Sequence, residues 1–373
     1  MISIAWKNLL HSRVKFVMTI LGVSFATVLV LVQGGIYLGL VESASTIVSN
    51  SEGDLWITPK NLVNIDFGYA ISPTRLNRVR ATKGVAWAER LIFAFSIVKL
   101  PHGGTDHLQI VGTEPGSRLG MPWSMKEGRV EDLWKGPSLI IDESARRKLR
   151  GLEIGDRVEV AEHRVDIVGI SREARSFTTA PLAFSSYKTA EKLVPWLKGR
   201  SIYVVGKLES GADRDAVLRE LRQMGDVDVY TREEIERKTQ TYWMTETGVG
   251  FGFLLTIALG LVVGMAIVGQ VLYASTMDHI RDYGTLKAIG VPNWKLSGIV
   301  LEQAFIVAAI GYVLGLAVAG ALMRVYASTQ MTMVLSPYLV GGSLVITLFM
   351  CGAGALFSVQ KVARVDPALV FRA

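Results

Sequence analysis

The chain has 373 residues, half of them hydrophobic, and a formal net charge of +7. That length allows two or three units of ordinary domain size, and the lone Cys351 excludes an intrachain disulfide. Segment 41–246 carries 30 basic and 29 acidic residues, interspersed along the chain, which excludes a phosphate-binding stripe and hence nucleic-acid binding.

Long apolar stretches predict four transmembrane helices, at residues 16–40, 249–272, 297–323 and 334–359. Each exceeds the roughly 20 residues needed to cross the hydrocarbon core, and none has the polar face of an ordinary core helix. The first stretch is longer than a signal-peptide core of about 7 to 15 residues, so we interpret it as a retained anchor. The expected fold class is a polytopic α-helical membrane protein, with a large mixed α/β extracytoplasmic domain inserted between the first and second spans.

Charge beside the spans predicts the orientation in the bilayer. The flanking segments 1–15, 277–296 and 360–373 together carry nine basic and three acidic residues. The positive-inside rule therefore places both termini and the loop 277–296 in the cytoplasm, as expected for a protein of the bacterial inner (plasma) membrane. The expected regions are the N-terminus with the first span (1–40), the extracytoplasmic (periplasmic) domain (41–245), and three spans with the coupling loop and C-terminal tail (246–373).

The inserted segment shows strand patterns at 53–59, 91–100, 108–112, 138–142, 155–160, 164–170, 201–205 and 227–230, with helices at 143–149 and 214–224. The runs 155–160 and 164–170 alternate apolar and polar residues across a short connection, which predicts a hairpin in a small β-barrel-like module. The strand–helix–strand order at the end of the segment is typical of a small α+β subdomain.

A capping box of Thr231 and Glu234 predicts the start of a helix that leads into the second span. No proline follows until Pro292, so one alternative is an unbroken helix from about 232 to 278, roughly 70 Å long. The other is a break near Gly248 and Gly250, because glycines weaken a helix. Either alternative connects the extracytoplasmic domain directly to the cytoplasmic loop.

Glycines recur on one face of the second span (Gly252, Gly260, Gly264) and of the third (Gly311, Gly315). Such faces let another helix approach closely. They predict helix packing within the chain or contact with a second copy of it.

The sequence contains no P-loop, no G-x-S-x-G or H-E-x-x-H motif and no paired His or Cys metal spacing. It therefore predicts a non-catalytic subunit with no catalytic residues and no metal site. Glu302 is the only acidic residue within the four stretches. An intramembrane acid is a candidate functional residue, but Glu302 lies near the inner end of its span, where it can reach water.

Three segments resemble the MacB/FtsX-type ABC transporter permeases: AWKNLL at 5–10, RDYGTLKAIG at 281–290 and ARVDPAL at 363–369. The order of one span, a large external segment and three spans is also similar. The loop resembles the family pattern R-E-x-G-x-L-[KR]-A-[IL]-G, with Asp282 in place of Glu. Glu302 matches a position where the family commonly has an acid.

This resemblance implies a permease that works with a second copy or a related paralogue and with a separate cytoplasmic ABC ATPase. ATP and Mg would bind in that ATPase, and no cofactor would bind directly to this chain. The resemblance implies that the ATPase-coupling residues are Arg281, Asp282, Tyr283, Gly284, Leu286, Lys287, Ala288 and Gly290. Movements of the periplasmic domain would then drive efflux of an amphiphilic cargo such as a lipid, peptide or drug.

MacB carries its ATPase at the N-terminus, whereas this chain begins near its first span, so its plan is more similar to the DevC-like permeases. Those permeases work with a periplasmic membrane-fusion adaptor and an outer-membrane channel. Two alternatives stay open, an FtsX-like regulator of a cell-wall hydrolase and a LolC/LolE-like lipoprotein-releasing subunit.

Overall fold

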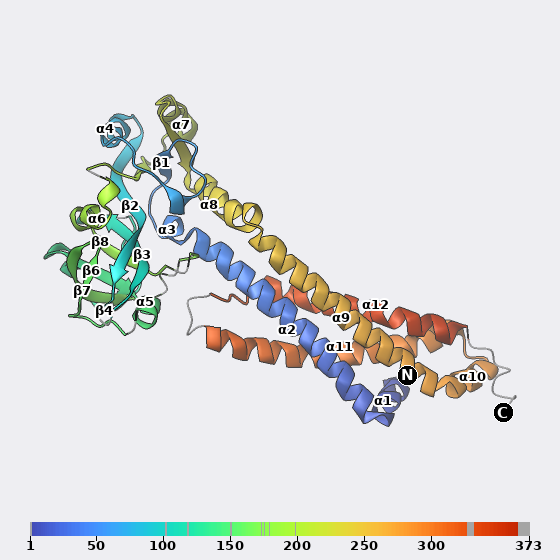
Figure 1. The fold of residues 1–373 in the computed structure, drawn as a ribbon. Helices are drawn as coiled ribbons and strands as arrows, with labels where there is room; N and C mark the ends of the chain where they lie inside the picture. Colours follow the sequence, from blue (N-terminus) through green and yellow to red (C-terminus); the bar gives the residue numbers. More distant parts are fainter. Residues whose placement is uncertain are drawn as a thin grey trace. The chain divides into compact units, whose positions relative to one another are not determined.

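The computed structural model describes residues 2–100, 103–117, 119–149, 151–172, 174, 176–178, 180–197, 199–326 and 332–364. The chain forms two compact units (Figure 1). The membrane unit comprises Met1–Leu38, Gly250–Ala327 and Met333–Ala373, and the inserted unit comprises Gly39–Val249 with Ser328–Thr332. Of the segments that carry the family resemblance, the tail from Val365 onward lies outside the described residues.

Four helices of the described residues are long and apolar enough to span a membrane: α2 (Arg13–Ala44), α9 (Val249–Asp278), α11 (Asn293–Tyr326) and α12 (Pro337–Ala363). Each overlaps one of the stretches predicted from the sequence. The shorter helices α1 (Ile2–His11) and α10 (Ile280–Ala288) lie before α2 and between α9 and α11. The predicted fold class, with an α/β domain between the first and second spans, is therefore confirmed.

Glycines of α11 lie directly against α2. A Cβ on Gly311 would lie 2.6 Å from Cγ1 of Val23, and one on Gly315 would lie 2.7 Å from Cβ of Thr27. Both distances are shorter than a carbon–carbon contact allows, so only glycine lets these two backbones approach this closely.

Glycines of α9 pack on the same helix α2. Gly260 faces Leu29, and Gly264 faces Ala26 of α2 and Met350 of α12. Gly252 differs, because nothing lies within 4 Å of the position of its Cβ. Helix packing within the chain thus occupies four of the five predicted glycines and leaves Gly252 on an open surface.

Strands of the inserted unit are β1 (Leu55–Pro59), β2 (Val85–Lys99), β3 (Thr105–Thr113), β4 (Met125–Gly128), β5 (Ser138–Asp142), β6 (Arg157–Val160), β7 (His163–Ser171), β8 (Leu182–Ser186), β9 (Tyr203–Leu208) and β10 (Val227–Thr231). They pair in the order β10-β1-β9-β2-β3-β8-β5-β7-β4, and β6 pairs with both β2 and β7. The circuit β2-β3-β8-β5-β7-β6 therefore returns to β2. This closed ring confirms the predicted barrel-like module, and the antiparallel β6–β7 pair confirms its hairpin.

The long strand β2 belongs to two modules. Its first part, Val85 to Leu91, pairs with β9, whereas Ile92 to Lys99 pairs with β3. The β9 side carries a separate hydrophobic core, to which α4 (Thr74–Ala81) and α7 (Arg214–Arg222) contribute apolar side chains. This side is the α+β subdomain that the sequence predicts.

Remaining elements of the inserted unit are short: the helices α3 (Thr46–Ser49), α5 (Glu143–Lys148) and α6 (Tyr187–Leu193), and 3₁₀ turns at Ile65–Phe67, Val130–Trp134 and Pro195–Leu197. The strands β4 and β8 and the helices α4 and α6 have no counterpart in the sequence analysis. Strand β4 is a polar edge strand, and β8 has only five residues. Neither alternates between buried and exposed residues, so neither shows the pattern of a half-buried strand.

The helix before the second span breaks, as in the second of the two alternatives. Helix α8 (Arg232–Thr241) begins at the predicted capping box, where the Glu234 amide donates to Oγ1 of Thr231 over 3.1 Å. A π-helical turn (Tyr242–Glu246) follows, and Gly248 then adopts a φ of +75° before α9 begins. That left-handed conformation ends the helix and favours glycine.

Enlarging a glycine at the α2–α11 contact should destabilise the membrane unit. We expect Gly315→Leu to lower the free energy of unfolding by about 1–3 kcal/mol, because overpacking forces the backbones apart. Gly320→Leu is the matched control on the same helix, since nothing lies within 4 Å of its Cβ position. Thermal melting of the purified chain in detergent measures the difference, and equal melting temperatures for the two variants would contradict the contact.

Candidate functional site

Helix α10 has one buried face and one exposed face. Tyr283 is 2% exposed and Gly284 is buried, whereas Arg281, Asp282 and Ala288 are exposed. The segment that the sequence treats as one coupling site is therefore divided by the fold. Its inward half packs into the core, and its outward half exposes the charged side chains of Arg281 and Asp282.

Tyr283 anchors α10 in the core of the membrane unit. Its side chain belongs to the same buried cluster as Leu9 of α1 and Leu296 of α11. Burial raises the pKa of Tyr283 to about 12, so its hydroxyl stays protonated near neutral pH. The side chains of Asn8 and Gln303 lie beside that hydroxyl and oppose the shift in its pKa.

The end of α10 is a Schellman motif, which explains the glycine at position 290. The Val291 amide donates to the Leu286 carbonyl over 3.0 Å, and the Gly290 amide donates to the Lys287 carbonyl over 3.1 Å. Gly290 has a φ of +93°, as this motif requires. The turn fixes the angle at which the chain leaves α10 for α11.

Polar contacts join α10 and its neighbours to the other helix ends. Lys287 Nζ donates to the Ala363 carbonyl at the end of α12 over 2.9 Å. Lys15 forms an ion pair with Asp278 at the end of α9. The imidazole of His279 lies 2.9 Å from the Asp282 carboxylate. The Lys287 bond therefore connects α10 to the end of α12, and the Lys15–Asp278 pair connects α2 to the end of α9, just before α10.

The predicted intramembrane acid, Glu302, has a buried oxygen, Oε2, without a hydrogen-bond partner in the described residues. The neighbouring Gln303 is 1% exposed, and its Oε1 is unpaired in the same way. Buried polar atoms without partners are uncommon and mark sites for water or for conformational change. None of the ion pairs formed by the described residues includes Glu302.

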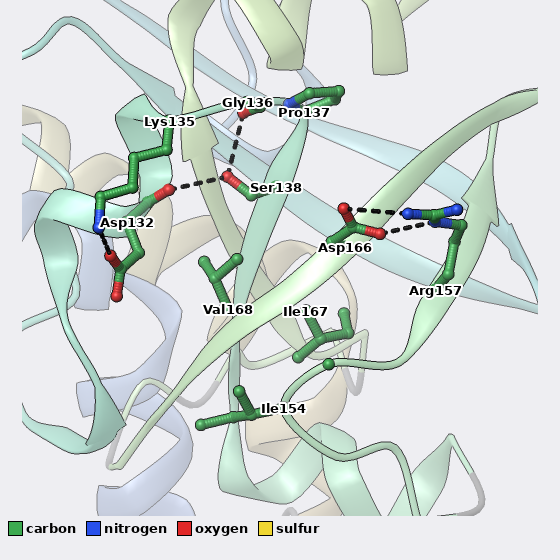
Figure 2. A pocket seen from close by; sticks show the side chains of 11 residues that line it. Asp132, Lys135, Gly136, Pro137, Ser138, Ile154, Arg157, Asp166, Ile167 and Val168 are labelled. Carbon is green, nitrogen blue, oxygen red and sulfur yellow. Dashed lines mark hydrogen bonds and ion pairs between the residues drawn. The ribbon is translucent and has the colours of Figure 1, made fainter.

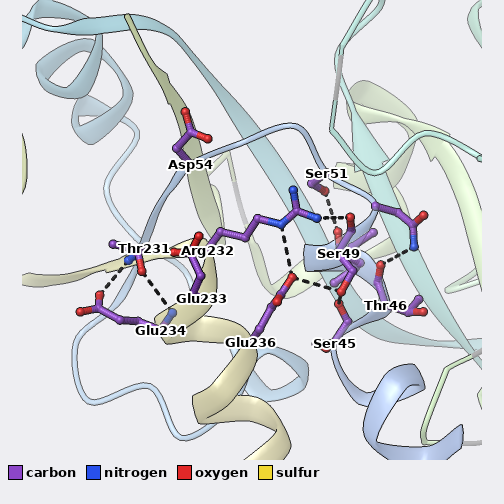
Figure 3. A network of polar contacts seen from close by, with 12 residues as sticks. Ser45, Thr46, Ser49, Ser51, Asp54, Thr231, Arg232, Glu233, Glu234 and Glu236 are labelled. Atoms are coloured by element: carbon purple, nitrogen blue, oxygen red, sulfur yellow. Dashed lines mark hydrogen bonds and ion pairs between the residues drawn. The ribbon is translucent and has the colours of Figure 1, made fainter. Parts of the chain in front are cut away.

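A second polar site, which the sequence analysis missed, lies in the inserted unit (Figure 3). We name it the α3–α8 clamp and define it by Ser45, Ser49, Arg232, Glu236 and Gln240. Arg232 donates to the Ser49 carbonyl and, over 3.3 Å, to Glu236 Oε1. Ser49 Oγ donates to the same Glu236 oxygen over 3.1 Å, and Gln240 Nε2 donates to Ser45 Oγ over 3.0 Å.

The clamp lies where the chain enters and leaves the inserted unit. Helix α3 follows α2 directly, and α8 precedes α9 by one π-helical turn. The clamp therefore fixes together the two segments by which the inserted unit joins the first and second spans.

A buried carboxylate holds the π-helical turn beside the clamp. Trp243 Nε1 and Gln109 Nε2 each donate to Asp66 over 2.8 Å. The Trp243 ring also packs on Phe177, with ring centroids 4.4 Å apart. Desolvation by burial raises the pKa of Asp66, and the two hydrogen bonds oppose that shift. Since Gln109 lies on β3, the carboxylate connects the turn to the barrel-like module.

A pocket of about 490 Å³ opens on the barrel-like module (Figure 2). Its charged side chains pair with one another: Lys135 with Asp132 over 2.6 Å and Arg157 with Asp166 over 2.7 Å. Ile154 and Val168 form its apolar part. The pocket can accept an apolar group, but its charges are already neutralised. Among the described residues, no group of three His, Cys, Asp or Glu side chains could hold a metal ion.

Comparisons with known proteins match both parts of the chain. The family model of the MacB-like periplasmic core domain matches residues 16–224, and that of the FtsX-like permease C-terminal domain matches residues 254–367. An "Uncharacterized ABC transporter permease" of Mycobacterium tuberculosis (strain H37Rv) is 26% identical over 100% of this chain and 99% of its own length.

A "Macrolide export ATP-binding/permease protein MacB" of Burkholderia cenocepacia is 25% identical over 61% of this chain and 35% of its own length. Among solved structures, the periplasmic region of MacB from Actinobacillus actinomycetemcomitans has a TM-score of 0.38 at 12% identity, covering 51% of this chain and 94% of that one.

The raised pKa of Asp66 predicts a pH dependence of stability. An acid with a raised folded-state pKa makes the folded state bind protons more tightly, so stability falls as pH rises from about 3.8 to the raised value. The slope is at most about 1.4 kcal/mol per pH unit. Asp66→Asn should remove this dependence, whereas the exposed control Asp215→Asn should keep it. Trp fluorescence melting of the full chain across pH 4 to 8 tests this, and parallel profiles for both variants would contradict it.

Proposed function

Since the chain belongs to the MacB/FtsX-type family of ABC transporter permeases, we propose that it couples ATP hydrolysis by a cytoplasmic ABC ATPase to movements of its inserted unit. The observation that carries this proposal is the two-faced helix α10. Tyr283 holds it in the core, while Arg281 and Asp282 stay exposed for a partner. The chain itself is the non-catalytic subunit, and ATP and Mg bind in the ATPase.

Force passes from α10 into several spans at once. Its Schellman turn fixes the direction into α11, Lys287 holds the end of α12, and the Lys15–Asp278 ion pair joins α2 to α9. In the inserted unit, the α3–α8 clamp ties the segments that follow the first span and precede the second. A movement that separates or twists these two segments must therefore deform or displace the inserted unit as a whole.

The proposed system exports an amphiphilic cargo with a periplasmic adaptor and an outer-membrane channel, and its permease works as a dimer. Similarity to a protein named for macrolide export supports export. The basic excess beside the spans supports cytoplasmic termini and a periplasmic inserted unit. Co-purification from native membranes with mass spectrometry tests the partners. An ABC ATPase with an adaptor supports export, a cell-wall hydrolase in place of the adaptor contradicts it, and no ATPase contradicts the coupling role.

Charge reversal on the exposed face of α10 should uncouple the system. We expect Arg281→Glu to reduce transport and permease-stimulated ATP hydrolysis at least 10-fold, because like charges across an interface cost several kcal/mol. Arg324→Glu is the matched control, since it reverses an exposed arginine in the last turn of α11, at the end of that span away from α10. Unchanged activity in Arg281→Glu, with folding confirmed by thermal melting, would sink the coupling assignment.

Breaking the α3–α8 clamp should separate ATP hydrolysis from transport. Glu236→Ala removes the acceptor shared by Arg232 and Ser49 and should cost about 1 kcal/mol of stability. We expect ATP hydrolysis to persist, because α10 is untouched, while transport per ATP falls several-fold. Glu220→Ala, on the exposed face of α7, is the control. Loss of hydrolysis and transport in parallel would show that the clamp has no separate transmitting role.

A further inference from the structure

Two apolar grooves border the exposed face of α9 in the membrane unit. One lies toward α2 and includes Lys15 and Leu21. The other, which we name the α9–α12 groove, consists of two adjoining cavities of about 520 and 500 Å³ that share Tyr273 and Phe357. Because the cavities share lining residues, the second groove continues along the helices.

The α9–α12 groove is long enough to hold a lipid acyl chain within one leaflet. It begins at Val262 and reaches Met277 at the end of α9. Those 15 residues rise about 22 Å, which exceeds the roughly 15 Å thickness of one leaflet's hydrocarbon. Ala266 and Gly269 are small residues, so they leave room for an acyl chain in the cavity nearer Val262.

The α10 end of this groove is basic. Lys361 and Arg364 line the lower cavity, and both side chains are exposed. Neither forms an ion pair with a carboxylate of the described residues. The groove toward α2 differs, because its one cation, Lys15, is neutralised by Asp278. Among the described residues, only the α9–α12 groove combines an apolar channel with cations that form no ion pair.

We propose that the α9–α12 groove binds an anionic glycerophospholipid, with an acyl chain along α9 and the phosphate between Lys361 and Arg364. Basic pockets between transmembrane helices are suited to acidic headgroups, and Tyr273 lies where an interfacial aromatic is expected. Placing the lipid in the inner leaflet rests on the orientation proposed above, whereas the groove and its charges do not.

The location links this lipid to the coupling element. Lys361 and Arg364 flank Ala363, whose carbonyl accepts the hydrogen bond from Lys287 of α10. A phosphate bound there neutralises two cations at the end of α12 and bridges them. The lipid thus stabilises the contact by which α10 holds α12.

Native mass spectrometry of the full chain in detergent tests the proposal. Phosphatidylglycerol and phosphatidylcholine with identical acyl chains are titrated separately, and we expect tighter binding of phosphatidylglycerol. The double variant Lys361→Gln/Arg364→Gln should weaken phosphatidylglycerol binding about 30-fold. Lys295→Gln, an exposed lysine in the first turn of α11 outside the groove, is the charge control and should keep it.

A second variant tests the apolar part without changing charge. Ala266→Trp fills the groove and should abolish binding of either lipid, whereas Ala258→Trp, exposed on the same helix but outside the groove, should not.

Equal affinity for the two lipids, or unchanged selectivity in the double variant, overturns the proposal. Direct binding of soluble glycerol phosphate that survives Ala266→Trp also overturns it, because the headgroup alone would be the ligand. Formation of a dimer whose interface covers the groove and excludes lipid would overturn the proposal as well. None of these readouts requires the ATPase, so they stand apart from the coupling proposal.

Discussion

The close approach of α2 to α9 and α11 is the contact on which the membrane unit depends. Helices in a bilayer gain no hydrophobic free energy by associating, so their packing relies on van der Waals contact between backbones. Gly311 and Gly315 permit that contact on α11, and Gly260 and Gly264 permit it on α9. With α2 held between them, the ends of the spans meet around Tyr283, and α10 acquires a fixed position.

Contacts with the rest of the membrane unit stabilise the helical conformation of α10. A short mixed-charge helix has too few residues to be stable alone, so its conformation comes from Tyr283 in the core, the Schellman turn at Gly290 and the bond from Lys287 to α12. Arg281 and Asp282 then face outward from a rigid support. In the inserted unit, likewise, the α3–α8 clamp holds α8, and the Asp66–Trp243 bond holds the π-helical turn that follows it in the chain.

Several features followed from local pattern and were confirmed. Length and apolarity identified the spans, the Thr231–Glu234 spacing identified the start of α8, and alternation identified the β6–β7 hairpin. Other features depend on residues far apart in sequence. The α3–α8 clamp joins Ser49 to Glu236, and the α9–α12 groove brings Lys361 beside Met277. Gly252 shows the converse, because it shares the spacing of Gly260 and Gly264 but meets no helix.

The sequence by itself determined where the chain crosses a membrane, because twenty consecutive apolar side chains are sufficient for that and need no tertiary context. It also determined the composition of α10 and the resemblance of that segment to the family pattern. Only the tertiary structure decided which half of α10 is buried, where the helix before α9 breaks, and which basic residues pair with an acid of the described chain. Those properties arise from non-local contacts, since a side chain's burial and pairing depend on the elements that pack against it.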